Sequence, residues 1–155
     1  MKDFLKETKI LINKFRDLSF YSIGTLVTNG IGGIFWLYMA SLLGTEGYGE
    51  ISYIISIGIM AGTISLAGMS NLLIIYGAKN VKIQSTIFLI GLISSGIVAS
   101  IIFFVVDNNI TVSLYIIGFV IFTLVTAELI GQKLFSKYSK IIIIQKIMLV
   151  IFSIA

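Results

Sequence analysis

The chain has 155 residues, of which 57% are hydrophobic and 12% charged, and it contains no Cys, His or Pro. A soluble domain carries about a quarter charged residues, so water cannot be the solvent for most of this surface, and a lipid bilayer is the expected partner. Without Cys or His, we expect no disulfide, metal or cofactor. The net charge is +4. In a membrane protein the positions of the basic residues indicate the orientation of the helices, so we expect no nucleic-acid partner.

The first segment, residues 1–17, is expected to form a cytoplasmic amphipathic helix in the membrane interface. Apolar residues recur there at three- and four-residue spacing, and lysines fall mostly between them. This pattern turns an apolar face toward lipid and the lysines toward phosphate groups. A secretory signal would have a shorter charged region and a small-residue cleavage site, so the segment is expected to stay attached.

Residues 18–155 contain five apolar stretches, which predict an all-α, polytopic transmembrane helix bundle. A helix needs about 20 apolar residues to cross the hydrocarbon core, and the runs lack the alternation of a transmembrane barrel. The first four are long enough, and the fifth is still apolar at Ala155. We therefore expect four complete helices and a truncated fifth, forming the N-terminal part of a larger transporter lobe. The expected ranges are about 18–43, 51–78, 83–106, 110–130 and 141–155.

The basic residues sort to alternate connections. All 11 fall within residues 1–17, within the turn at 79–82, or between residues 133 and 146. The remaining connections, 44–50 and 107–109, contain acidic residues and no Lys or Arg. The positive-inside rule then places the N-terminus in the cytoplasm and the protein in the cell membrane, with several passes.

Glycines mark two further features. Three glycines in the connection at 44–50 permit a tight reversal with positive φ angles. In the second stretch, Gly58 and Gly62 form a G-x-x-x-G motif, and Gly30, Gly32 and Gly33 cluster in the first. Small residues let helices approach closely in lipid, so packing is the ordinary interpretation, and flexibility of moving helices is the functional alternative.

The stretch Leu-Leu-Gly-Thr-Glu-Gly-Tyr-Gly-Glu-Ile-Ser at residues 42–52 resembles the polysaccharide-export branch of the MOP flippase superfamily. These are the O-antigen and teichuronic-acid type flippases, which are related to the MATE exporters. The resemblance continues through residues 66–79, where the family has a small-residue stretch before a basic cytoplasmic turn, and through 131–140 and Gln145. Ile75 departs from it, because many relatives have an arginine there.

The resemblance implies that the protein exports lipid-linked oligosaccharide, as a polyprenyl pyrophosphate, by alternating access during polysaccharide biosynthesis. Its partners would be a missing C-terminal lobe or a second copy of the chain. A pyrophosphate that leaves water needs cations, although the same cations can anchor to lipid headgroups. The candidate substrate-binding residues are Lys14, Arg16 and Lys79 at the cytoplasmic ends of helices, and Asn29, Asn71 and Glu128 in or near the spans.

Three alternatives stay open. A MATE-type multidrug or cation exporter would use acidic cavity residues, and Glu128 is the one clearly intramembrane acid; its ordinary roles are pairing with Lys133 or snorkelling to the interface. A small non-transporting membrane assembly protein, or a truncated product, would need no substrate site. Asn71 can equally form a helix–helix hydrogen bond.

The sequence has no catalytic triad, paired carboxylates or phosphate loop, so we expect no enzyme.

Overall fold

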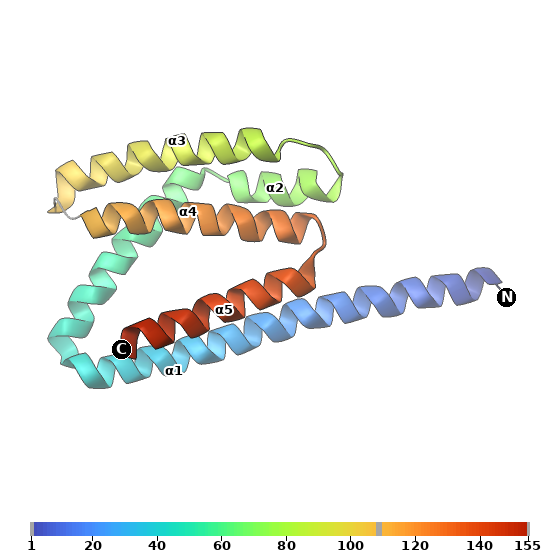
Figure 1. Ribbon diagram of the computed structural model, residues 1–155, viewed down its shortest axis with the longest axis horizontal. Coiled ribbons are helices and arrows are strands. Elements are labelled where there is room, and N and C mark those ends of the chain that lie inside the picture. Colours follow the sequence, from blue (N-terminus) through green and yellow to red (C-terminus); the bar gives the residue numbers. More distant parts are fainter. Residues whose placement is uncertain (1, 108–109, 155) are drawn as a thin grey trace. The chain divides into compact units, whose positions relative to one another are not determined.

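The computed structural model describes residues 2–107 and 110–154, with side chains described at Phe15 and in 19–105 and 110–151. The described chain is all-α, which confirms the predicted fold class. In order, the elements are α1 (Lys2–Leu66), α2 (Met69–Ala78), α3 (Gln84–Ile102), the π-helical turn η1 (Phe103–Asp107), α4 (Ile110–Gly131) and α5 (Phe135–Ile154) (Figure 1).

Helix α1 is kinked at Gly44, which has φ 69° and ψ −175°. A positive φ suits a residue without a Cβ atom. The sequence predicts a connection over residues 44–50, whereas residues 45–50 are helical. Gly47 and Gly49 remain helical because a helix satisfies its own backbone hydrogen bonds, and an isolated glycine costs a helix only about 1 kcal/mol.

The chain forms two compact units, which are described separately. Unit 1 contains residues 1–42 and 134–155, and unit 2 contains residues 43–133. Helix α1 therefore contributes its first part to unit 1 and its last part to unit 2, and α5 belongs to unit 1.

Three helical segments among the described residues are long and apolar enough to cross a membrane: Ser19–Leu66, Gln84–Val105 and Ile110–Gly131. The first covers the predicted span 18–43 from residue 19 onward, and only residues 51–66 of the predicted span 51–78, because α1 ends at Leu66. The sequence predicts a further span in the fifth apolar stretch, but α5 is not among these three segments, because its 20 residues include three lysines.

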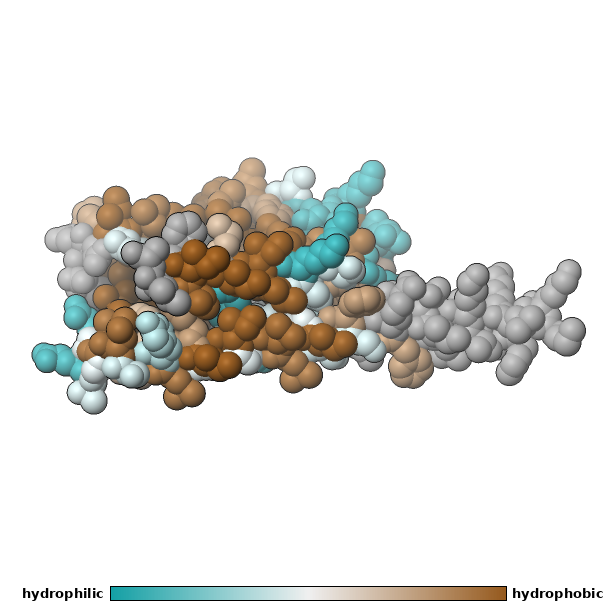
Figure 2. Space-filling model, turned by 60° about the horizontal axis from the view of Figure 1, so that its bottom comes forward, coloured by the Kyte–Doolittle hydropathy of each residue, from teal (hydrophilic) through white to brown (hydrophobic). Residues whose placement is uncertain are grey.

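The apolar side chains of these spans face mainly outward. Within an apolar 18-residue stretch of each segment, the buried share of the residues is only 11% for Ser19–Leu66, 22% for Gln84–Val105 and 28% for Ile110–Gly131. Figure 2 shows hydrophobic side chains over much of the drawn face. Water would disfavour so large an apolar surface, whereas lipid matches it. The chain thus has the helices and the exposed surface of a multi-pass membrane protein in contact with the bilayer.

In unit 2, α3 and α4 pack antiparallel, and α2 packs on α4. Gly91 of α3 lies against Leu124, and Ser113 Oγ of α4 donates a hydrogen bond to the Ala99 carbonyl at 3.1 Å. The buried apolar residues form two clusters: Leu66, Met69, Leu73, Ile87, Val120, Leu124 and Ala127 in one, and Ala61, Ala99, Val112 and Ile116 in the other.

The G-x-x-x-G motif packs the last part of α1 against α4. Gly58 lies against the Tyr115 ring and Gly62 against the Phe119 ring, and the two rings stack with centroids 6.4 Å apart. Both pairs increase together in residue number, so this part of α1 runs parallel to α4. Close packing therefore accounts for the motif. In the other glycine cluster, a Cβ built on Gly30 or Gly33 would have no described neighbouring atom within 4 Å, so no close contact within the described residues accounts for these two.

In unit 1, the first part of α1 packs parallel to α5. Tyr21 stacks on Tyr138 with ring centroids 5.1 Å apart. Further along both helices, a Cβ at Gly24 would lie 2.6 Å from Ser139 Oγ, and this hydroxyl donates a hydrogen bond to the Phe20 carbonyl at 2.7 Å. The glycine therefore permits close contact, and a hydrogen bond reinforces it.

Helix α5 begins at Phe135, earlier than the predicted start at Ile141. The reason is the aromatic face of its first turn, because the rings of Phe135 and Tyr138 both contact Tyr21 of α1. These contacts stabilise a helix over residues 135–140, which the lysines alone predict to be a connection.

Candidate functional site

The most unusual backbone in unit 2 is the helix break at Ala67 and Gly68. The sequence predicts one helix over 51–78, but Ala67 has φ 43° and Gly68 has φ 81°. The Ala67 amide donates to the Ile64 carbonyl at 3.1 Å, which closes a turn at the end of α1. A non-glycine residue at positive φ costs about 1–3 kcal/mol, so the surrounding structure must support the break.

Part of that support comes from Ser94 of α3. A helix end leaves carbonyl groups without intrahelical partners, and an unpaired group in lipid costs several kcal/mol. Ser94 Oγ donates to the Ser65 carbonyl at 2.8 Å, and Ser65 Oγ lies 3.5 Å from Ser94 Oγ. Ser65 is only 1% exposed. The Ser65 carbonyl at the end of α1 is therefore hydrogen-bonded within the protein, whereas Ala67 and Gly68 themselves are exposed.

The residues on either side of the break are buried among apolar side chains. Leu66 and Met69, which flank it, are buried in one cluster with Leu73, Val120 and Leu124. The last part of α1 and the first turn of α2 thus share one core with α4 while their helix axes are separate. This arrangement is a discontinuous helix, not a frayed end.

Basic residues gather at one end of unit 2. The C-terminal ends of α2 and α4 meet where Gly77 packs on Gly131, since a Cβ on Gly77 would lie 3.2 Å from Gly131 Cα. Lys79 caps α2 directly after this contact and is exposed. Lys82 lies in the connection that follows α2, and Lys133 directly follows α4, so all three belong to the same end.

Acidic residues lie at the opposite end of unit 2. Glu46 and Glu50 occupy the first turns after the Gly44 kink, in a segment that runs parallel to α4. Asp107 ends η1, just before α4 begins. The charge separation that the sequence shows between alternate connections is therefore also a separation in space within this unit.

Glu128, the intramembrane acid of the sequence, lies half-buried on α4 near the basic end. Its Oε1 atom accepts a hydrogen bond from Gln132 Nε2 at 2.8 Å. This hydrogen bond joins the carboxylate to a side chain one helical turn later, and pairing with Lys133 or snorkelling to the interface stay predictions. The side-chain amide of Gln132 thus satisfies part of the hydrogen-bonding capacity of the Glu128 carboxylate.

The other candidates divide between the two units. Asn71 lies exposed on α2 in unit 2, and Asn29 lies exposed on α1 in unit 1. The helix–helix hydrogen bond, the alternative role of Asn71, stays a prediction. Lys14 and Arg16 belong to α1 by their backbone, and their side chains lie outside the described ones. Unit 2 therefore contains Asn71, Lys79 and Glu128 of the predicted set.

Lys146 is a functional candidate that the sequence reasoning missed. The sequence counts it with the basic residues between 133 and 146, although it also falls within the fifth apolar stretch, 141–155, and it lies in the middle of α5. Its Nζ atom lies 3.8 Å from the position that a Cβ on Gly32 of α1 would take. The signal that could have found it is its own position inside the apolar stretch.

Among the described residues, no group of three or more His, Cys, Asp or Glu side chains is arranged to hold a metal ion. Comparisons of the chain with protein-family models, with curated proteins and with solved structures found no match. The function is therefore inferred from the contacts of this chain together with its short motifs.

Proposed function

We propose that this chain is the N-terminal part of a multi-pass exporter that flips lipid-linked oligosaccharides by alternating access, with its N-terminus in the cytoplasm. The observation that carries the proposal is the discontinuous helix at Ala67 and Gly68. The break falls inside residues 66–79, one of the stretches that resemble polysaccharide-export flippases.

A discontinuous helix suits a transporter for a physical reason. Irregular backbone at membrane depth is tolerated where protein or a water-filled cavity covers it, and transporters use such helices at the moving parts around their cargo. In this chain, Ser94 donates a hydrogen bond to the Ser65 carbonyl at the end of α1, while Ala67 and Gly68 are exposed. The two halves can change their mutual angle at Gly68 without unpairing the rest of either helix.

The direction of the helices supports several crossings. In the proposed topology, the first part of α1 and α5 cross the bilayer in the same direction, in keeping with their parallel packing in unit 1, which requires an odd number of crossings between them. The segment 45–78, α3 and α4 would supply three. With the positive-inside rule, the end of unit 2 that carries Lys79 and Lys133 faces the cytoplasm. The exposed Lys79 is then available to a pyrophosphate at the cytoplasmic mouth, together with Lys14 and Arg16.

The rival cation exporter would need carboxylates free to bind cargo. Glu128 is the one clearly intramembrane acid of the sequence, and one of its oxygens accepts a hydrogen bond from Gln132. Efflux of cationic dyes from cells that express the gene would instead support the MATE-type alternative.

We expect the gene, expressed with its complete reading frame, to restore polysaccharide export in a strain that lacks its own flippase. A hydrogen bond to a charged group contributes about 1.5–3 kcal/mol. Arg16→Gln should therefore lower export roughly tenfold or more at unchanged membrane abundance, and Arg16→Lys should lower it less. Absence of export at normal abundance would contradict the proposal, and normal export by Arg16→Gln would remove Arg16 from the site.

A further inference from the structure

Lys146 lies on α5 where that helix faces α1, far from the lysines at the start of the helix. Its side chain is half-buried, and its Nζ atom lies over Gly32, where a Cβ would be 3.8 Å away. A lysine within an apolar helix is costly unless an anion or water meets its ammonium group. The neighbouring sequence supplies no such anion, because residues 18–45 and 129–155 contain no Asp or Glu.

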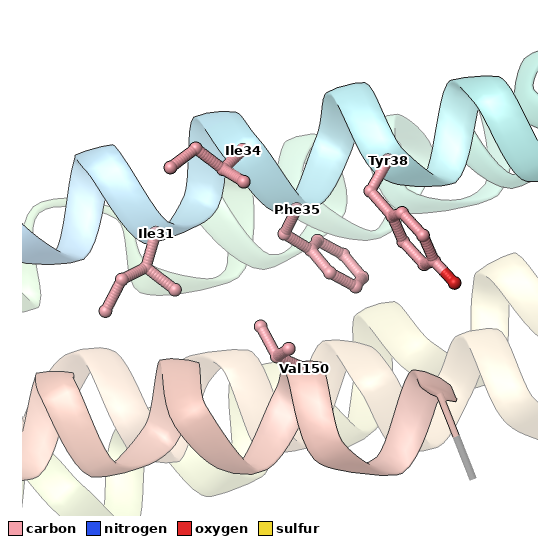
Figure 3. Close-up of a pocket in the computed structure, with 5 residues that line it drawn as sticks. All are labelled: Ile31, Ile34, Phe35, Tyr38 and Val150. Carbon is pink, nitrogen blue, oxygen red and sulfur yellow. The ribbon is translucent and has the colours of Figure 1, made fainter.

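An apolar groove of about 280 Å³ lies beside this lysine, between α1 and α5 of unit 1. Figure 3 shows side chains of α1 directed toward α5, and Val150 directed back toward α1. The lining residues are Ile31, Ile34, Phe35, Tyr38 and Val150. Val150 follows Lys146 by one helical turn, and Gly32 lies between Ile31 and Ile34, so the cation is at the edge of the groove.

We infer that this groove binds the acyl chain of an anionic phospholipid whose phosphate contacts the Lys146 ammonium group. A lone cation next to a dry apolar groove is complementary to an amphiphile that carries one anionic head and a hydrocarbon tail. Helical side chains point toward the helix N-terminus, so the Lys146 amine reaches toward the end of unit 1 that carries Lys137 and Lys140. The head therefore lies on the basic side, and the tail extends past Val150. This site does not depend on the proposed transport.

Trp36, the only tryptophan of the chain, provides a local reporter. Its ring lies next to that of the groove residue Phe35, with centroids 5.6 Å apart. The purified chain is reconstituted in vesicles of phosphatidylcholine with brominated acyl chains, which quench tryptophan on contact. Unbrominated phosphatidylglycerol then replaces a fraction of this lipid, and unbrominated phosphatidylcholine replaces the same fraction in a parallel series.

We expect Trp36 fluorescence to recover at a roughly fivefold lower mole fraction of phosphatidylglycerol than of phosphatidylcholine, as one lysine near lipid phosphate predicts. Lys146→Gln should remove the difference, and Lys146→Arg should keep it. Lys140→Gln, an exposed lysine on the same helix, is the matched control and should keep most of it. Circular dichroism checks that each variant remains helical.

Three results would overturn the inference. Trp36 fluorescence could recover equally with the two lipids, or the preference for phosphatidylglycerol could persist in Lys146→Gln. The preference could also be lost when inorganic phosphate is added to the vesicles, because the site would then bind a free anion rather than a lipid. An unchanged preference in phosphate supports the lipid as the ligand.

Discussion

Gly131→Ala is expected to destabilise the protein by about 2–3 kcal/mol, near the upper end of the range for overpacking. A Cβ at this position would lie 2.6 Å from the Leu73 carbonyl oxygen and 3.1 Å from Ile74 Cα. Both are backbone atoms of α2, so no side-chain rotation relieves the clash. Helix α2 must move away from α4, and the buried contacts of Leu73 are lost with that movement.

Unfolding of the purified protein in detergent, followed by circular dichroism, measures this effect. The matched control is Gly118→Ala on the same helix, where nothing lies within 4 Å of the added Cβ. Since alanine favours a helix over glycine by about 1 kcal/mol, the control should be neutral or slightly stabilised. Equal stability of the two variants would mean that α2 and α4 do not meet at this glycine.

Gly24→Ala is expected to weaken the packing of α5 on α1 by about 1–3 kcal/mol. The new Cβ would lie 2.6 Å from Ser139 Oγ and 2.7 Å from Ser139 Cβ. The serine hydroxyl cannot rotate away without giving up its hydrogen bond to the Phe20 carbonyl. Trp36 lies in the same unit, so its fluorescence during unfolding reports the loss.

Gly33→Ala, at an open position on the same helix, is the control and should unfold like the parent. The double variant Gly24→Ala with Ser139→Gly removes both clashing atoms and should recover part of the loss, which a double-mutant cycle quantifies. Additive effects of the two substitutions would show that these residues do not touch.

The sequence predicts the all-α class and most helices because continuous apolar runs leave few alternatives in lipid. It does not predict the break at Ala67 and Gly68, because the group that stabilises it, Ser94, is 29 residues from Ser65. The position of the kink at Gly44 also could not be predicted from the sequence. Three glycines of the predicted connection can each adopt a positive φ, and only Gly44 does so.

The candidate site was less predictable than the helices. Residue type alone proposes Asn29, Asn71 and Glu128, whereas packing decides which helix face each one occupies. Glu128 accepts a hydrogen bond from a glutamine one turn away. Lys146 falls within the predicted fifth stretch, but its position over Gly32 follows only from the packing of α5 on α1.

The central claim is that the chain crosses the bilayer several times, with its basic connections on one face. The chain has no native Cys, so single-cysteine variants can be labelled with a membrane-impermeant maleimide in intact and in permeabilised cells. We expect Lys79→Cys and Lys137→Cys to react only after permeabilisation, and Glu46→Cys to react in intact cells. Reaction of the cysteines at 79 and 137 from opposite sides of the membrane would contradict the account.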